Sequence, residues 1–96
     1  MAEYKQQTHA VKSGIGVDSQ YGAVVPPIYL STNYTFAGYG EKRQFDYSRS
    51  GNPTRETLGQ ALAALEGGSG AVITGTGMGA VNLVAEALLR CGDLLV

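Results

Sequence analysis

This sequence has little cysteine and no clustered charge. Among its 96 residues there is one cysteine, Cys91, so an intramolecular disulfide framework is excluded. The basic and acidic side chains are scattered along the chain, and the formal net charge is −1. Nucleic-acid binding usually requires a basic stripe, which this distribution does not supply. We therefore expect no disulfide and no nucleic-acid partner.

Long apolar runs are also missing. No stretch approaches the roughly 20 apolar residues that a membrane-spanning helix needs. The first residues, MAEYKQQTHAVKSG, lack the apolar centre of a secretory signal. We accordingly predict a soluble, cytoplasmic protein without a membrane partner, and we expect no metal site.

Regular periodicity is weak in the first half of the chain. Residues 1–52 are rich in Gly, Ser, Thr, Tyr and Pro, and only their beginning has a faint helical period. Within the stretch VVPPIYLSTNYTF, Pro26 and Pro27 cannot donate to a sheet ladder, and Pro26 restricts Val25 to extended conformations. The pattern predicts an extended arm that contains an ordered loop or edge segment rather than a central strand.

A helix is predicted over residues 53–66. Asn52 is a good N-cap, Pro53 suits the first helical position, and Glu56 favours the positive end of the helix dipole. Apolar residues then recur with helical spacing, at Leu58, Ala61, Leu62 and Leu65, until Gly67 and Gly68 stop the run.

The remaining residues have the pattern of a parallel crossover. Residues 71–74 form a short apolar run typical of a buried strand, a helix is predicted over about 78–90, and residues 94–96 begin another apolar strand. These elements indicate the α/β class. Such a sheet must be covered on both faces, which one helix layer cannot do. We therefore expect this chain to be a fragment of a longer protein.

The turn GTGMGA lies between the predicted strand and the second helix. The backbone N–H groups of Gly77, Met78 and Gly79 are expected to point out of the helix start, where the helix dipole favours a phosphate group. A turn that only connects strand and helix is an equal alternative. The string Gly75-x-Gly77-x-x-Ala80 also matches the dinucleotide-binding fingerprint, but the acidic residue expected after the second strand is missing, since Asp93 precedes that strand.

The stretch DYSRSGNPTR places a phenol and a guanidinium two residues apart, just before the first long helix. If this stretch is extended, Tyr47 and Arg49 share a face, where an arginine fork and a tyrosine hydroxyl suit phosphate oxygens. The alternative is an ordinary loop arginine beside a tyrosine that packs on the core.

Three segments in order resemble the Cys/Met-metabolism family of pyridoxal-phosphate enzymes. They are VVPPIYLSTNYTF, YSRSGNPTRETLGQALAALEGG and the loop TGMGA. The resemblance implies the large domain of a fold-type I transferase, with pyridoxal 5′-phosphate as cofactor. It implies that Gly77 and Met78 bind the cofactor phosphate of their own subunit, and that Tyr47 and Arg49 reach the phosphate of a neighbouring subunit in a homo-oligomer.

The same resemblance divides the chain and suggests its chemistry. Residues 1–52 would be an arm that contacts the other subunit and contributes to its site, and residues 53–96 the incomplete beginning of the cofactor-binding domain. The Schiff-base lysine would lie beyond Val96, so no catalytic residue is assigned here except Tyr47, a candidate for assisting proton transfer. The expected reaction joins cysteine to an activated homoserine ester. Other family reactions on amino-acid substrates, a dinucleotide-binding fragment and a non-catalytic phosphate-binding module are the alternatives.

Overall fold

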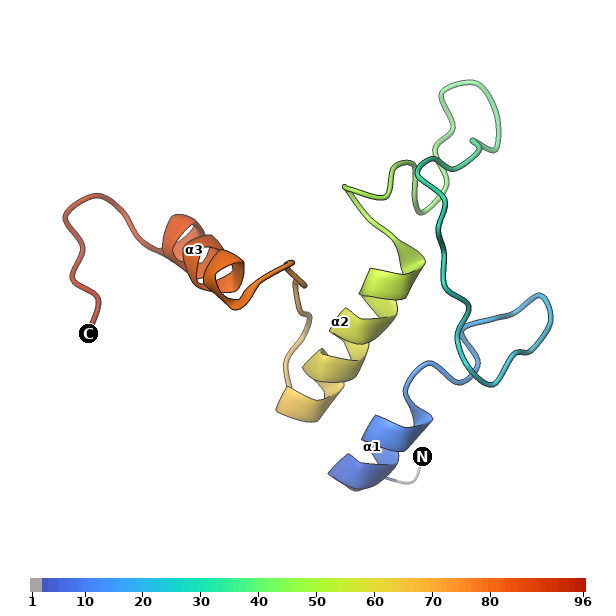
Figure 1. Ribbon diagram of the computed structural model, residues 1–96, viewed down its shortest axis with the longest axis horizontal. Coiled ribbons are helices and arrows are strands. Elements are labelled where there is room, and N and C mark those ends of the chain that lie inside the picture. The colour runs from blue at the N-terminus through green and yellow to red at the C-terminus, as the bar shows by residue number, and fades with distance from the viewer. Residues whose placement is uncertain (1–2) are drawn as a thin grey trace.

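The computed structural model describes residues 3–96 and contains three helices in this part of the chain. They are α1 (Gln6–Lys12), α2 (Pro53–Glu66) and α3 (Gly77–Leu88). Helix α1 packs against α2, while α3 projects away from this pair (Figure 1). Each helix within residues 3–96 is too short or too polar to cross a lipid bilayer.

Helix α2 has the predicted bounds, and both of its ends have local caps. The Asn52 side chain accepts a hydrogen bond from the Thr54 N–H, and Pro53 occupies the first turn. At the other end Gly67 has a left-handed backbone with φ of 68°, which glycine adopts without the cost that a side chain would bring. The N–H groups of Gly67 and Gly68 both donate to the Ala63 carbonyl.

The sequence predicted an extended arm over residues 1–52, but part of this arm forms helix α1. The Gln6 side chain donates a hydrogen bond to the Leu65 carbonyl at 3.2 Å, which ties α1 to the end of α2. Within α1 and just before it, the Tyr4 ring stacks edge-on against His9 and lies under the Lys12 ammonium. The seven-residue helix has no side-chain cap, so the sequence carries little local signal for it.

The predicted strand over residues 71–74 is not formed. These residues run beside α2, where Gly59 is buried, and a Cβ added at Gly59 would lie 3.2 Å from the Ala71 carbonyl oxygen. A strand is defined by ladder hydrogen bonds to a neighbour, and no other segment among residues 3–96 pairs with this one. The strand predicted to begin at residues 94–96 is likewise not formed.

Two isolated antiparallel bridges connect segments of the arm and its neighbouring loop. Asn33 pairs with Tyr47, and Gly38 pairs with Glu41 at the tip of the loop between them. Residues 25–28 form no strand, as the prolines predicted.

The described part of the chain is extended rather than compact. Its radius of gyration is 16.7 Å, compared with about 12 to 13 Å for a compact domain of this length. Ala63 is its only buried apolar side chain, and α3 has no buried residue at all. A helix that is apolar on most sides, as α3 is, normally lies inside a larger protein.

Gly67 offers a test of how α2 ends. In the complete protein, we expect Gly67→Ala to lower the free energy of unfolding by about 1 kcal/mol, because alanine is strained in the left-handed region. Urea denaturation measures this change. Gly68→Ala is the matched control, since Gly68 has no positive φ and a Cβ there meets only ordinary contacts. Equal losses in the two variants would contradict this explanation.

Asp18 offers a test of the turn that follows α1. Its carboxylate accepts hydrogen bonds from the N–H groups of Ala23 at 3.0 Å, Tyr21 at 3.3 Å and Gln20 at 3.2 Å. These hydrogen bonds lower the pKa of the Asp18 carboxyl. The Ala23 N–H contributes most, the N–H groups of Tyr21 and Gln20 contribute less, and partial burial acts in the opposite direction. A lowered pKa means that the charged form stabilises the turn.

This stabilisation should be complete above about pH 4, the ordinary Asp pKa, and should disappear as the pH falls through the lowered pKa. The NMR shift of the Ala23 amide against pH measures it. In Asp18→Asn, which cannot titrate, the step should be absent. A step centred above the ordinary Asp pKa would overturn the assignment.

Candidate phosphate site

Tyr47 and Arg49 are brought together as predicted, although not by an extended segment. Tyr47 is extended in its bridge to Asn33, and the chain then turns, so that the N–H groups of Ser50 and Gly51 both donate to the Tyr47 carbonyl at 3.0 Å. The Arg49 guanidinium curls back and donates to the Tyr47 hydroxyl at 3.0 Å, with its Cζ 5.4 Å from the ring centre. The turn therefore produces the phenol and guanidinium pair.

The pair is anchored through the residue between its two members. The Ser48 N–H donates to the Thr32 carbonyl at 2.8 Å, and the Ser48 hydroxyl donates to the Ser31 carbonyl. The Arg55 guanidinium, from the first turn of α2, donates to the Arg49 carbonyl at 3.3 Å. The backbone of the pair is thus held by both the arm and α2, while the two side chains stay exposed.

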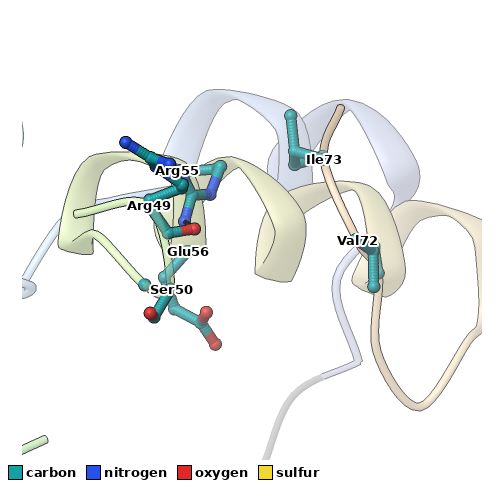
Figure 2. A pocket seen from close by; sticks show the side chains of 8 residues that line it. Arg49, Ser50, Arg55, Glu56, Val72 and Ile73 are labelled. Atoms are coloured by element: carbon teal, nitrogen blue, oxygen red, sulfur yellow. Dashed lines mark hydrogen bonds between the residues drawn. The ribbon is translucent and has the colours of Figure 1, made fainter. Parts of the chain in front are cut away.

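An open pocket of about 330 Å³ lies beside Arg49. Arg49, Ser50, Arg55 and Glu56 form one side of it, and Val72 and Ile73 form the other (Figure 2). Tyr47, Gly77 and Met78 do not line this pocket. It is therefore not the place where the predicted binding residues meet.

The start of α3 has free backbone donors. Thr76 is the N-cap, and its hydroxyl accepts the Gly79 N–H at 2.9 Å, while the Thr76 carbonyl accepts the Ala80 N–H. The N–H groups of Gly77 and Met78 have no hydrogen-bond acceptor within residues 3–96. The prediction that Gly79 also offers its N–H is wrong, because Thr76 already takes it.

Glycine has different roles along this turn. A Cβ at Gly79 would lie 3.0 Å from the Thr76 hydroxyl oxygen, so a side chain there would press on the cap. A Cβ at Gly75 or Gly77 would meet no atom within 4 Å. Gly77 and Met78 are both exposed, and their N–H groups lie at the positive end of a helix, an arrangement that suits an anion.

No hydrogen bond in the described part of the chain joins the Tyr47 and Arg49 pair to the start of α3. The two groups of donors lie on separate segments, one before α2 and one after it. The sequence named these four residues as candidates, and their binding role stays a prediction. It did not predict what holds the first pair, because Ser48 contacts Ser31 and Thr32, which are distant in the chain.

Comparison with known proteins places this chain in one family. The family model for Cys/Met metabolism PLP-dependent enzymes matches residues 7–96. The chain therefore belongs to this family, and the resemblance predicted from its motifs is confirmed. The dinucleotide-binding alternative is wrong.

Particular relatives are similar over almost the whole chain. Cystathionine γ-synthase of Escherichia coli is 60% identical over 92 residues, which cover 96% of this chain and 24% of that protein. The crystal structure of cystathionine γ-synthase from Xanthomonas oryzae in complex with cystathionine is 61% identical, with a TM-score of 0.91, and the match covers 96% of this chain and 24% of that one. Cystathionine γ-lyase from Lactobacillus plantarum is 36% identical, with a TM-score of 0.83, over 94% and 23% of the two chains.

These likenesses confirm the fold class. The chain has the fold of the corresponding part of fold-type I pyridoxal-phosphate enzymes, whose α/β large domain the sequence predicted. It spans about a quarter of the length of the relatives that it matches.

Proposed function

We propose that this chain is the amino-terminal part of a cytoplasmic, homo-oligomeric cystathionine γ-synthase that uses pyridoxal 5′-phosphate. One observation carries the proposal. The relatives at 60 and 61% identity over 96% of this chain are γ-synthases, whereas the cystathionine lyases of Lactobacillus plantarum and Lactococcus lactis are 36 and 37% identical. The division into an arm (residues 1–52) and the start of the cofactor-binding domain (residues 53–96) belongs to the same proposal.

The donor set fits the phosphate group of this cofactor. Gly77 and Met78 offer two backbone N–H groups at a helix start, which would hold the phosphate in their own subunit. Arg49 and Tyr47 offer a charged fork and a hydroxyl that already contact each other, and we assign these to the phosphate of a neighbouring subunit. The cross-subunit assignment is supported by the family resemblance and by the separation of the two groups along the chain.

Each contact has a defined task in the proposed reaction. When bound, the cofactor supplies the electron sink that makes proton loss from an amino acid feasible. The residues of this chain hold the phosphate end and so fix the orientation of the ring. The Tyr47 hydroxyl is in addition a candidate for assisting proton transfer, because it is exposed and oriented by Arg49.

The proposed net reaction is a replacement at the γ carbon of an activated homoserine ester. The bond between the γ carbon and the ester oxygen breaks, the acid leaves, and the sulfur of cysteine forms the new bond to that carbon. Cystathionine is the product. The X. oryzae relative has been crystallised with cystathionine, and also with aminoacrylate and cysteine.

Product analysis of the complete protein tests this reaction. With pyridoxal phosphate, cysteine and the acetyl, succinyl or phosphoryl ester of homoserine, we expect cystathionine to accumulate for at least one ester, as measured by mass spectrometry. Breakdown of added cystathionine should be slower than its synthesis. Faster breakdown would favour a lyase, and a preference for sulfide over cysteine would favour a sulfhydrylase. Absence of any turnover with bound cofactor would favour a non-catalytic module.

Replacing Arg49 tests the phosphate assignment. Arg49→Ala removes a charge-assisted hydrogen bond but leaves the α2 cap at Asn52 intact. Such a bond contributes roughly 1.5 to 3 kcal/mol, so cofactor affinity should fall by about 10- to 150-fold. Titration of the apo-protein measures the affinity. Arg43→Ala is the matched control, since Arg43 is also an exposed arginine of the arm, and it should bind cofactor normally.

Hybrid oligomers test the crossing between subunits. A chain with Arg49→Ala is mixed with a chain whose Schiff-base lysine is replaced. If Arg49 serves the neighbour, some sites in the hybrid carry neither lesion, and activity should return. If cofactor loss in the single variant is confirmed and the hybrid regains nothing, Arg49 serves its own subunit.

A further inference from the structure

The Asn52 side chain does more than cap α2. Its oxygen accepts the Thr54 N–H at 2.9 Å, which is the capping bond. Its nitrogen lies within hydrogen-bond distance of three oxygens: the Tyr29 carbonyl at 3.2 Å, the Tyr34 hydroxyl at 3.2 Å and the Ser48 hydroxyl at 3.0 Å. An amide nitrogen has two N–H bonds, so these three acceptors share them.

Capping alone does not require an asparagine at this position. Serine, threonine and aspartate cap helices about as well, because each supplies an oxygen to the same N–H groups. Only an amide of this length combines that acceptor with donors that point the other way. The donor side of Asn52 is therefore the part that its capping role leaves unexplained.

The donor side leads to the phosphate-directed pair. Ser48 lies between Tyr47 and Arg49 in the chain, and its hydroxyl receives the shortest of the three Asn52 contacts. The Tyr29 carbonyl and Tyr34 hydroxyl belong to the arm segment that pairs with Tyr47 through Asn33. Asn52 thus connects the first turn of α2 with both sides of the segment that carries the pair.

We propose that Asn52 is a positioning residue, whose amide nitrogen holds the loop so that Tyr47 and Arg49 present their hydroxyl and guanidinium groups together to a phosphate. This inference rests on the proposed phosphate role of that pair. It assigns to the Asn52 nitrogen a contribution to cofactor affinity that is separate from its contribution to helix stability.

Asn52→Ser in the complete protein separates the two contributions. Serine keeps a capping oxygen and adds no charge, but it cannot reach the three acceptors. We expect the urea midpoint to stay close to that of the wild type, whereas the dissociation constant of pyridoxal phosphate, titrated against the apo-protein, rises by about 3- to 10-fold. Asn52→Ala, which also loses the cap, should lower the urea midpoint in addition.

A double-mutant cycle with Arg49→Ala identifies the route of the effect. If Asn52 acts through the pair, Asn52→Ser should change cofactor affinity by less than about twofold once Arg49 is already alanine. A general loss of structure would add to the Arg49 effect instead. Additive losses, or an unchanged affinity in Asn52→Ser alone, overturn the inference.

The same cycle separates this inference from the proposed function. If Arg49→Ala alone leaves cofactor affinity unchanged, the phosphate role of the pair is wrong, and the inference falls with it. If Arg49→Ala weakens binding and Asn52→Ser does not, only the positioning role is wrong. Should Asn52→Ser fail to fold, Tyr34→Phe takes its place in the cycle, because it removes one acceptor of the amide and leaves the cap intact.

Discussion

The first turn of an α-helix has backbone N–H groups that the helix itself cannot satisfy, and this constraint organises the structure at two places. At α2 the Asn52 side chain supplies the missing acceptor, and at α3 the Thr76 side chain does so. The other backbone N–H groups of the two first turns differ in number and in their partners. At α2, Pro53 has no N–H, and the Arg55 N–H has no acceptor within residues 3–96. At α3, the N–H groups of both Gly77 and Met78 have no acceptor there. The start of α3 therefore leaves two backbone donors without a partner among residues 3–96, and the start of α2 leaves one.

The capped start of α2 also holds the arm in place. Thr54, within the first turn of α2, accepts the Tyr29 N–H at 2.9 Å, and Asn52 contacts the carbonyl of the same tyrosine. An arm without an apolar core of its own is thus held by hydrogen bonds to a helix end. Such bonds depend on geometry rather than on buried area, which is consistent with an arm whose large apolar side chains, such as Leu30 and Tyr39, remain exposed.

Exposed apolar surface is the other general property of this chain. Val81, Val84 and Leu88 on α3 are all more than half exposed, and so are Leu94 and Leu95 after it. Hydrophobic burial is the main stabilising contribution in folded proteins, and the three helices provide little of it among themselves. The stability of this region must come largely from protein that covers these surfaces.

The sequence predicted the elements whose signals are local. Asn52, Pro53 and Gly67 mark the ends of α2 without reference to any distant residue, and the predicted bounds were correct. The predicted second helix, over about 78–90, agrees with α3 to within two residues at each end. Residue type and spacing also singled out four candidates, Tyr47, Arg49, Gly77 and Met78, to which the family resemblance gave a phosphate-binding role that stays a prediction.

What the sequence could not predict depends on partners that spacing does not reveal. The strand over residues 71–74 needs a neighbouring strand, and α1 depends on its contact with the end of α2 rather than on a cap. The contacts of Asn52 with Tyr29, Tyr34 and Ser48 join positions that no local pattern relates. Local residue patterns therefore suggested the candidate donors, and only the folded arrangement revealed the hydrogen bonds that hold the segment between Tyr47 and Asn52.

The crowding at Gly79 has a consequence for how this family can diverge. A Cβ at position 79 would press on the Thr76 cap, 3.0 Å from its hydroxyl oxygen, whereas a Cβ at position 75 or 77 would meet no atom within 4 Å. A relative that bound no anion at this turn would still be constrained toward glycine at position 79, because a side chain there crowds the Thr76 cap of the helix. Glycine at position 77 could then be replaced by other residues, because a side chain there would meet no neighbouring atom. Within this short turn, a substitution at position 77 alone would indicate the loss of a ligand, whereas a substitution at position 79 would indicate a change at the start of the helix.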